Sequence, residues 1–180
     1  MKLEIELKNK RPVELVDFSL SMVALGAEYR RFSAEIADGE SHLYIRGLRD
    51  GSIIAELIPA AIYVSSLLPE ITQHAKKVLE FAKFLKDARD FLLGHGKKPD
   101  GMEKKSLQNI SQFLEPVAKD GGSQINISAM HINGDIHMHY SVTSVEAGAI
   151  QNAVSRSLSL EKPSITGLHQ GVGLYWTQAR

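Results

Sequence analysis

The sequence predicts an α+β protein, and three observations carry that prediction. Residues 2–8, KLEIELK, alternate charged and apolar side chains, as expected of a strand with one buried face. Two longer segments, 12–36 and 70–93, repeat apolar residues at helical spacing. Asp50-Gly51 and Asn133-Gly134, pairs that favour two-residue turns, each lie between apolar runs and therefore predict two β-hairpins.

The first 94 residues predict a β-α-β-β-α unit. Pro12 opens the first helix at a position where proline is tolerated. One apolar stripe runs along this helix, made of Val16, Leu20, Val23 and Ala27. The second helix ends at Gly94, a residue type that commonly terminates helices.

The hairpin predicted at residues 43–58 has two largely apolar faces. A two-residue loop places Tyr44 opposite Leu57 on one face, and Ile45 opposite Glu56 on the other. The helices of the chain can cover only one face, so we expect the other to meet a second copy or another protein. The candidate interaction residues are Tyr44, Ile45, Ile54, Glu56 and Ile58.

Three regions follow from this pattern: an α+β domain at 1–94, a Gly/Pro/Lys linker at 95–101 and a hairpin-and-helix domain at 102–180. The last region predicts a short helix that Pro116 closes, a hairpin at 125–142, a helix capped by Thr143 and Glu146, and a strand at 171–180. Since the chain stops on a predicted strand, we expect that it could be C-terminally truncated. Whether the two halves pack as one unit is left open.

The second hairpin carries three histidines. Its expected register places His137 and His139 on the outer face and His131 on the opposite one. A closed zinc site needs four ligands and a catalytic one normally takes three from the protein. Two histidines without a neighbouring carboxylate or thiol favour a solvated hairpin face over a metal site, so no cofactor is expected.

Composition disfavours several classes of function. The 180 residues carry 21 Lys+Arg and 21 Asp+Glu, without the basic excess that nucleic-acid binding normally requires. The absence of cysteine removes disulfides and thiolate nucleophiles and fits a cytoplasmic protein. The longest apolar stretch, 53–68, is interrupted by Glu56 and Pro59 and is shorter than the ~20 residues of a membrane-spanning helix.

No catalytic residue can be assigned from motifs. The chain has neither a phosphate-binding P-loop nor a G-x-S-x-G nucleophile elbow. Glu56 is the one carboxylate within an apolar strand run, and therefore a candidate base, but no second catalytic group can be placed beside it.

The segments LYIRGLRDGSIIAELIPA and INGDIHMHYSVTSVEAGAIQNAV resemble the N-terminal part of an uncharacterised family of bacterial proteins. Those chains are longer, so the resemblance implies that this chain lacks its C-terminal end. It implies no activity and no site residues.

Two functions remain in view. The first is a non-enzymatic interaction module that forms a homo-oligomer, or binds a protein partner, through a hairpin or through the 70–93 helix. The alternative is a small-molecule-binding or enzymatic domain that uses Glu56 or the His137/His139 face. It predicts a pocket between the N-terminal sheet and its helices.

Overall fold

The computed structural model describes residues 1–36, 41–49, 53–59, 68–131 and 135–160. Within them, one antiparallel sheet of five strands has the order β2-β3-β1-β4-β5. The strands are β1 (Lys2–Lys8), β2 (Leu43–Arg49), β3 (Ile53–Pro59), β4 (Gln124–Met130) and β5 (Ile136–Thr143). The helices are α1 (Leu15–Ile36), α3 (Leu68–Leu92), α4 (Lys104–Phe113), α5 (Glu115–Lys119) and α6 (Ser144–Leu160). The predicted α+β class is confirmed.

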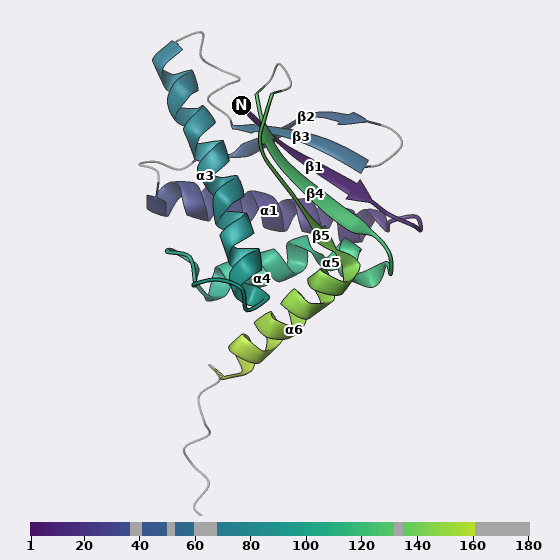
Figure 1. Ribbon diagram of the computed structural model, residues 1–180. Helices are drawn as coiled ribbons and strands as arrows, with labels where there is room; N and C mark the ends of the chain where they lie inside the picture. Colours follow the sequence, from purple (N-terminus) through teal and green to yellow (C-terminus); the bar gives the residue numbers. More distant parts are fainter. Residues whose placement is uncertain (37–40, 50–52, 60–67, 132–134, 161–180) are drawn as a thin grey trace, which may run out of the picture.

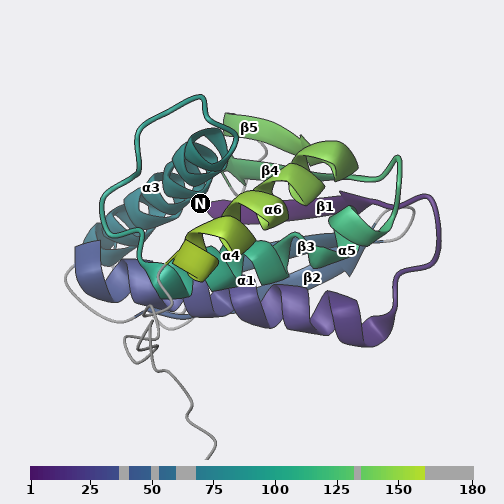
Figure 2. The same cartoon turned by 90° about the horizontal axis from the view of Figure 1, so that it is seen from below.

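Strand β1 lies at the centre of the sheet and joins the two halves of the chain. It pairs with β3 on one side and with β4 on the other. Strands from before and after residues 95–101 therefore form one sheet. Figures 1 and 2 show the labelled helices together on one face of this sheet, and we call the opposite face, which none of these described helices covers, the open face.

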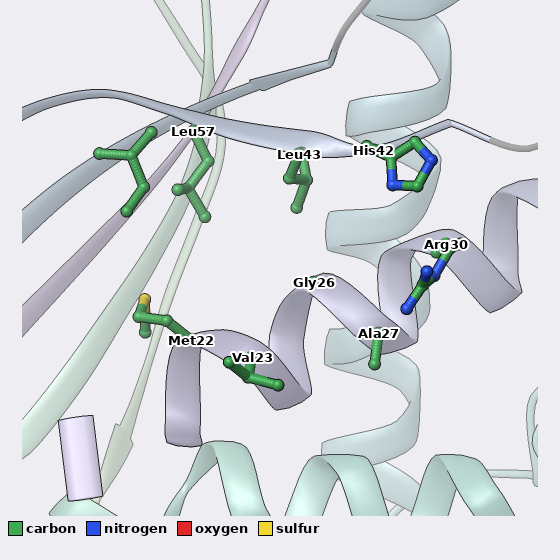
Figure 3. Close-up of a pocket in the computed structure, with 9 residues that line it drawn as sticks. Met22, Val23, Gly26, Ala27, Arg30, His42, Leu43 and Leu57 are labelled. Carbon is green, nitrogen blue, oxygen red and sulfur yellow. The ribbon is translucent and has the colours of Figure 1, made fainter. Parts of the chain in front are cut away.

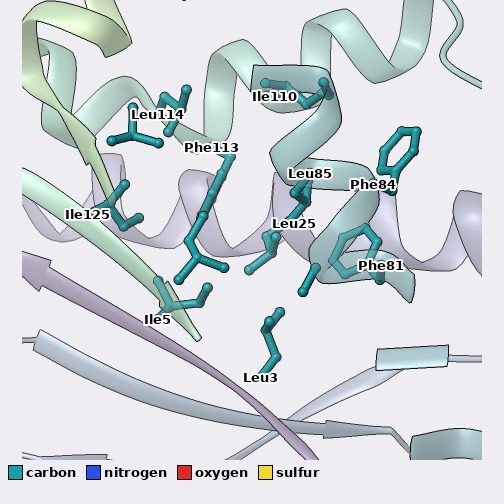
Figure 4. Packing of buried hydrophobic residues seen from close by; sticks show 14 of the residues in the cluster. Leu3, Ile5, Leu25, Phe81, Phe84, Leu85, Ile110, Phe113, Leu114 and Ile125 are labelled. Carbon is teal, nitrogen blue, oxygen red and sulfur yellow. The ribbon is translucent and has the colours of Figure 1, made fainter. Parts of the chain in front are cut away.

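The core lies between the sheet and these helices (Figure 4). The alternation predicted for β1 is confirmed, because Leu3, Ile5 and Leu7 are at most 3% exposed and point to the helices. Helix α3 adds Phe81, which contacts the ring of Tyr29 in α1 at a centroid distance of 5.1 Å. Such ring pairs contribute about 0.5–1.5 kcal/mol beyond the burial of their area.

Helix α1 begins at Leu15, three residues after the predicted start at Pro12. Its buried side differs from the predicted apolar stripe. Leu25, Tyr29 and Phe32 face the core, whereas the stripe residues Val16, Leu20 and Val23 are 57%, 46% and 67% exposed. The helix therefore has two apolar sides, and only one of them is covered.

The ends of two helices follow their sequence signals. After α3, the amide of His95 donates to the carbonyl of Asp90 and that of Gly94 to Phe91, with Gly94 at φ 83°. This is a C-terminal cap that favours glycine. At the start of α6, Thr143 and Glu146 form the predicted capping box, with the Thr143 amide 2.8 Å from a carboxylate oxygen of Glu146.

The sequence predicted that Pro116 closes a helix. In the structure, Pro116 instead lies in the first turn of α5. The reason is that proline lacks an amide hydrogen and so fits a first turn, where that hydrogen would have no partner within the helix. Among the described helices, none combines the length and the apolarity that a membrane crossing requires.

The register predicted for the second hairpin is confirmed over most of its length. Residues 124–129 pair with residues 138–143 as expected, and a shift follows between Ala129 and Met130. The first hairpin differs, since Tyr44 pairs with Ile58 and Ile45 with Leu57. The two predicted turns, the predicted strand 171–180 and residues 60–67 lie outside the described residues.

Candidate functional site

A bulge in β2 explains the changed register of the first hairpin. The pairing shifts between Ile45 and Gly47, so β2 uses one residue more than β3 at this point. Side chains of a strand alternate between faces, and one extra residue therefore moves those beyond it to the opposite face. As a result, Ile45 points to the helix side of the sheet and Tyr44 to the open side.

Exposed apolar side chains gather where β2 lies beside α1. Val16, Leu20 and Val23 on α1, together with Ile45 on β2, are between 46% and 67% exposed. We call these four residues the α1–β2 surface. Five other large apolar residues are exposed among those that the structure describes: Leu15 on α1, Tyr44 on β2, Ile136 on β5, and Val145 and Leu160 on α6.

A hollow of about 360 Å³ opens between α1 and the strands β2 and β3 (Figure 3). Its lining is mostly apolar, with Arg30 and His42 as the polar members. Gly26 contributes to its width, because no atom lies within 4 Å of the position that a Cβ would occupy there. The other lining residues are Met22, Val23, Ala27, Leu43, Ile45 and Leu57.

The described residues that line the hollow include no carboxylate, serine, threonine or cysteine, and therefore no nucleophile–base pair of the usual kind. Glu56, His137 and His139 do not line it. The pocket that the enzymatic alternative predicted between sheet and helices therefore has a counterpart, but the residues named for that alternative lie elsewhere.

Glu56 lies on the open face of the sheet in a network of charged groups. Lys2 Nζ donates to Glu56 Oε1 at 2.7 Å and lies 3.4 Å from Glu4 Oε2. The lysine and the two glutamates are 10–18% exposed at their side chains. This ion pair between a central and a neighbouring strand fits a structural role for Glu56.

The five interaction candidates do not form one surface. Tyr44, Ile54, Glu56 and Ile58 lie on the open face, and Ile45 lies on the helix side. Ile58 is buried at 5% exposure, whereas Tyr44 is 49% exposed.

The three histidines of the second hairpin take part in two separate contacts. Ser128 Oγ lies 2.9 Å from His139 Nδ1, a hydrogen bond whose direction depends on the tautomer. The rings of His131 and His137 meet edge to face with centroids 4.4 Å apart. The prediction that His131 points away from His137 is wrong, because the register shift after Ala129 turns this end of the hairpin. Among the described residues, no group of three or more candidate ligands could hold a metal ion.

Shifted pKa values occur at packing contacts rather than in the hollow. Arg11, whose side chain donates to Asp120 at 3.0 Å, is the main cause that lowers the pKa of that carboxyl. Burial raises the pKa of Tyr140, whose hydroxyl is buried without a hydrogen-bond partner among the described residues. Neither group lines the hollow.

The exposure of the α1 stripe was not predicted from the sequence. One signal was present: α1 carries two apolar rows, one with Val16 and Leu20 and another with Leu25, Tyr29 and Phe32. A helix that covers a single sheet buries one such row, so the second indicates an additional surface.

Comparisons with protein-family models, curated proteins and solved structures found no match to this chain.

Proposed function

We propose that this protein is a non-enzymatic interaction module that associates with a second copy of itself through the α1–β2 surface. The observation that carries the proposal is the exposure of Val16, Leu20, Val23 and Ile45 on one helix and the strand beside it. Contiguous apolar side chains on a protein surface commonly mark an interface.

Charge favours a second copy as the occupant. The chain has equal numbers of acidic and basic residues, so two copies do not repel each other through net charge. The lining of the hollow supplies two basic side chains and otherwise apolar groups, which suits the burial of a partner's apolar side chains better than a reaction.

The energetics indicate a reversible association. Full burial of a valine, leucine or isoleucine side chain contributes about 1.5–3 kcal/mol. Each copy brings four such side chains that are roughly half exposed, so a dimer gains on the order of 8 kcal/mol by this estimate. Association itself costs about 4–15 kcal/mol. We therefore expect an equilibrium between monomer and dimer that depends on concentration.

Light scattering across a wide concentration range tests this proposal. The mass should rise from 19.9 kDa towards twice that value as the concentration increases. Ile45→Glu should hold the protein as a monomer, because it places a charge in the interface. Ile136→Glu is the matched control, since Ile136 is also on an edge strand and is 60% exposed, against 57% for Ile45.

A parent protein that stays monomeric at every concentration would overturn the proposal. Equal effects of Ile45→Glu and Ile136→Glu would show that the α1–β2 surface is not involved.

The proposed setting is the cytoplasm, which suits a chain without cysteine. The alternative use of Glu56 or of the His137/His139 face as a binding or catalytic site stays a prediction.

A further inference from the structure

We propose that residues 171–177 of the same chain dock beside β2 as a further strand and cover the hollow between α1 and the sheet, with Trp176 in it. These residues lie outside the described part of the chain. The inference concerns a surface that the proposed function also uses, but it does not depend on self-association. It makes this segment a competitor of a second copy for the hollow.

The hollow lies at one edge of the sheet. β2 is the last described strand on this side, and its residues Leu43 and Ile45 line the hollow together with Val23 of α1. Figure 3 shows Leu43 and Leu57 on the strand side, opposite Val23 and Gly26 on the helix. Ile45 and Val23 are 57% and 67% exposed. A strand beside β2 would therefore lie at the exposed side of the hollow and direct every second side chain into it.

The composition of the C-terminal segment favours a packed position over a solvated one. Residues 163–179 contain no Lys, Arg, Asp or Glu, although these residue types make up 23% of the chain. The large apolar side chains of this stretch are Ile165, Leu168, Val172, Leu174, Tyr175 and Trp176. Segments that stay solvated are typically rich in charge and poor in such side chains. The segment therefore favours an apolar surface, and the hollow offers one.

The order of residues in the segment fits a strand over the hollow. In GVGLYWT, residues 171–177, alternation places Val172, Leu174 and Trp176 on one side. Valine, tyrosine, tryptophan and threonine all favour strands. The hollow, of about 360 Å³, lies within the size range of pockets that bind drug-sized molecules, so it has room for an indole ring.

The connection from α6 is long enough for this placement. Helix α6 ends at Leu160, and Figure 2 shows it running from the β5 side of the molecule towards the α1 side. Residues 161–175 separate Leu160 from Trp176 and span up to about 50 Å when extended. That is about twice the length of α6, whose 17 residues rise by about 25 Å. The segment can therefore return from the end of α6 to β2.

Attachment to the same chain favours this segment over a second copy. A group joined by a flexible connection acts at an effective concentration on the order of 1 mM. For a chain of 19.9 kDa, a second copy matches this value only at about 20 mg/ml of protein. Below that concentration we expect the segment to be the main occupant of the hollow.

The fluorescence of Trp176 tests the docking, because this is the only tryptophan of the chain. In the dilute parent protein, its emission should have the short wavelength of a buried indole and resist quenching by acrylamide. Ile45→Glu places a charge in the lining, so it should shift the emission to longer wavelength and increase the quenching. Val23→Glu should do the same from the α1 side. Ile136→Glu is the matched control, since Ile136 is 60% exposed and does not line the hollow.

Light scattering of Trp176→Ala tests the competition with a second copy. If the segment covers the hollow in about nine of ten chains, its release should lower the apparent dissociation constant of the dimer by about tenfold or more. Tyr175→Ala is the matched control, because Tyr175 points away from the hollow in the proposed strand. Tyr175→Ala should leave the dissociation constant unchanged. Circular dichroism establishes that each variant is folded.

The outcomes separate this inference from the proposed function. A solvated emission of Trp176 in the parent protein would overturn the docking, as would equal shifts in Ile45→Glu and Ile136→Glu. An emission that becomes that of a buried indole only at high concentration would place the segment on a second copy and overturn docking within the chain. A parent protein that stays monomeric while Trp176 responds to Ile45→Glu alone would support the docking and overturn the proposed self-association.

Discussion

Asn109 donates a hydrogen bond from Nδ2 to Glu28 Oε2 at 2.8 Å, and both side chains are buried between α1 and α4. The same carboxylate accepts from Arg31 at 2.7 Å. Glu28 is only 1% exposed, and a carboxylate buried to this extent is costly unless it is hydrogen-bonded. This contact joins α4 to α1.

Asn109→Ala should therefore destabilise the fold. It removes a donor from a buried carboxylate, and hydrogen bonds to charged groups contribute about 1.5–3 kcal/mol. The expected loss, measured by urea unfolding, is about 2 kcal/mol. Gln108→Ala, at the exposed neighbouring position in α4, should change the free energy of unfolding by less than about 0.5 kcal/mol. Similar values for both variants would contradict the role of this contact.

Asp120 should make the stability of the fold depend on pH in the acid range. Its carboxylate accepts from the Arg11 side chain and from the amides of Lys10 and Arg11 at 2.7–3.0 Å. These contacts hold its pKa below the ordinary value of 3.8, the Arg11 side chain being the largest cause. A carboxyl whose pKa is lower in the folded than in the unfolded protein stabilises the fold at pH values above its unfolded pKa. This stabilisation is lost as the pH falls through the folded pKa.

The corresponding measurement is thermal unfolding between pH 7 and pH 2, within which a carboxyl of ordinary pKa near 4 titrates. Asp120→Asn should lower the melting temperature at neutral pH and flatten its decline below about pH 4. Asp100→Asn, at an exposed loop position, is the control and should keep the parent's profile. An unchanged acid profile in Asp120→Asn would refute the assignment.

Glu56→Gln should affect stability and leave the solution mass unchanged. The change removes the charge that Lys2 Nζ meets at 2.7 Å, although Glu4 remains within 3.4 Å of the same lysine. We expect a loss of about 1 kcal/mol in the free energy of unfolding, since the network keeps one of its two carboxylates. A dimer that dissociates in Glu56→Gln would place the interface on the open sheet face instead.

The two halves of the chain should not fold separately. A fragment of residues 1–94 lacks β4, so one edge of the central strand β1 loses its partner. The apolar side of the sheet also loses the cover of α4 and α6. Circular dichroism and denaturant titration of the fragment should show no cooperative unfolding, in contrast to the whole chain. A cooperative transition in the fragment would support the predicted domain at 1–94.

The local elements of this protein follow from the sequence by itself. Alternation predicts β1 and its buried side, Asn133-Gly134 predicts the register of most of the second hairpin, and Thr143 with Glu146 predicts the start of α6. Each of these signals acts over a few residues, through side-chain alternation, turn geometry or one hydrogen bond. They can therefore be recognised without knowledge of the rest of the chain.

Tertiary structure decided which surfaces are covered. In α6, Ala147, Ile150 and Val154 are buried, whereas the equally apolar Val145 is 81% exposed. In α1, two rows of apolar residues compete, and the packing of α3 and α4 selects the row with Leu25 and Phe32. The β2 bulge likewise moves Ile45 beside α1. These outcomes depend on contacts between residues distant in sequence, such as Ser21 with Phe113, which no local pattern encodes.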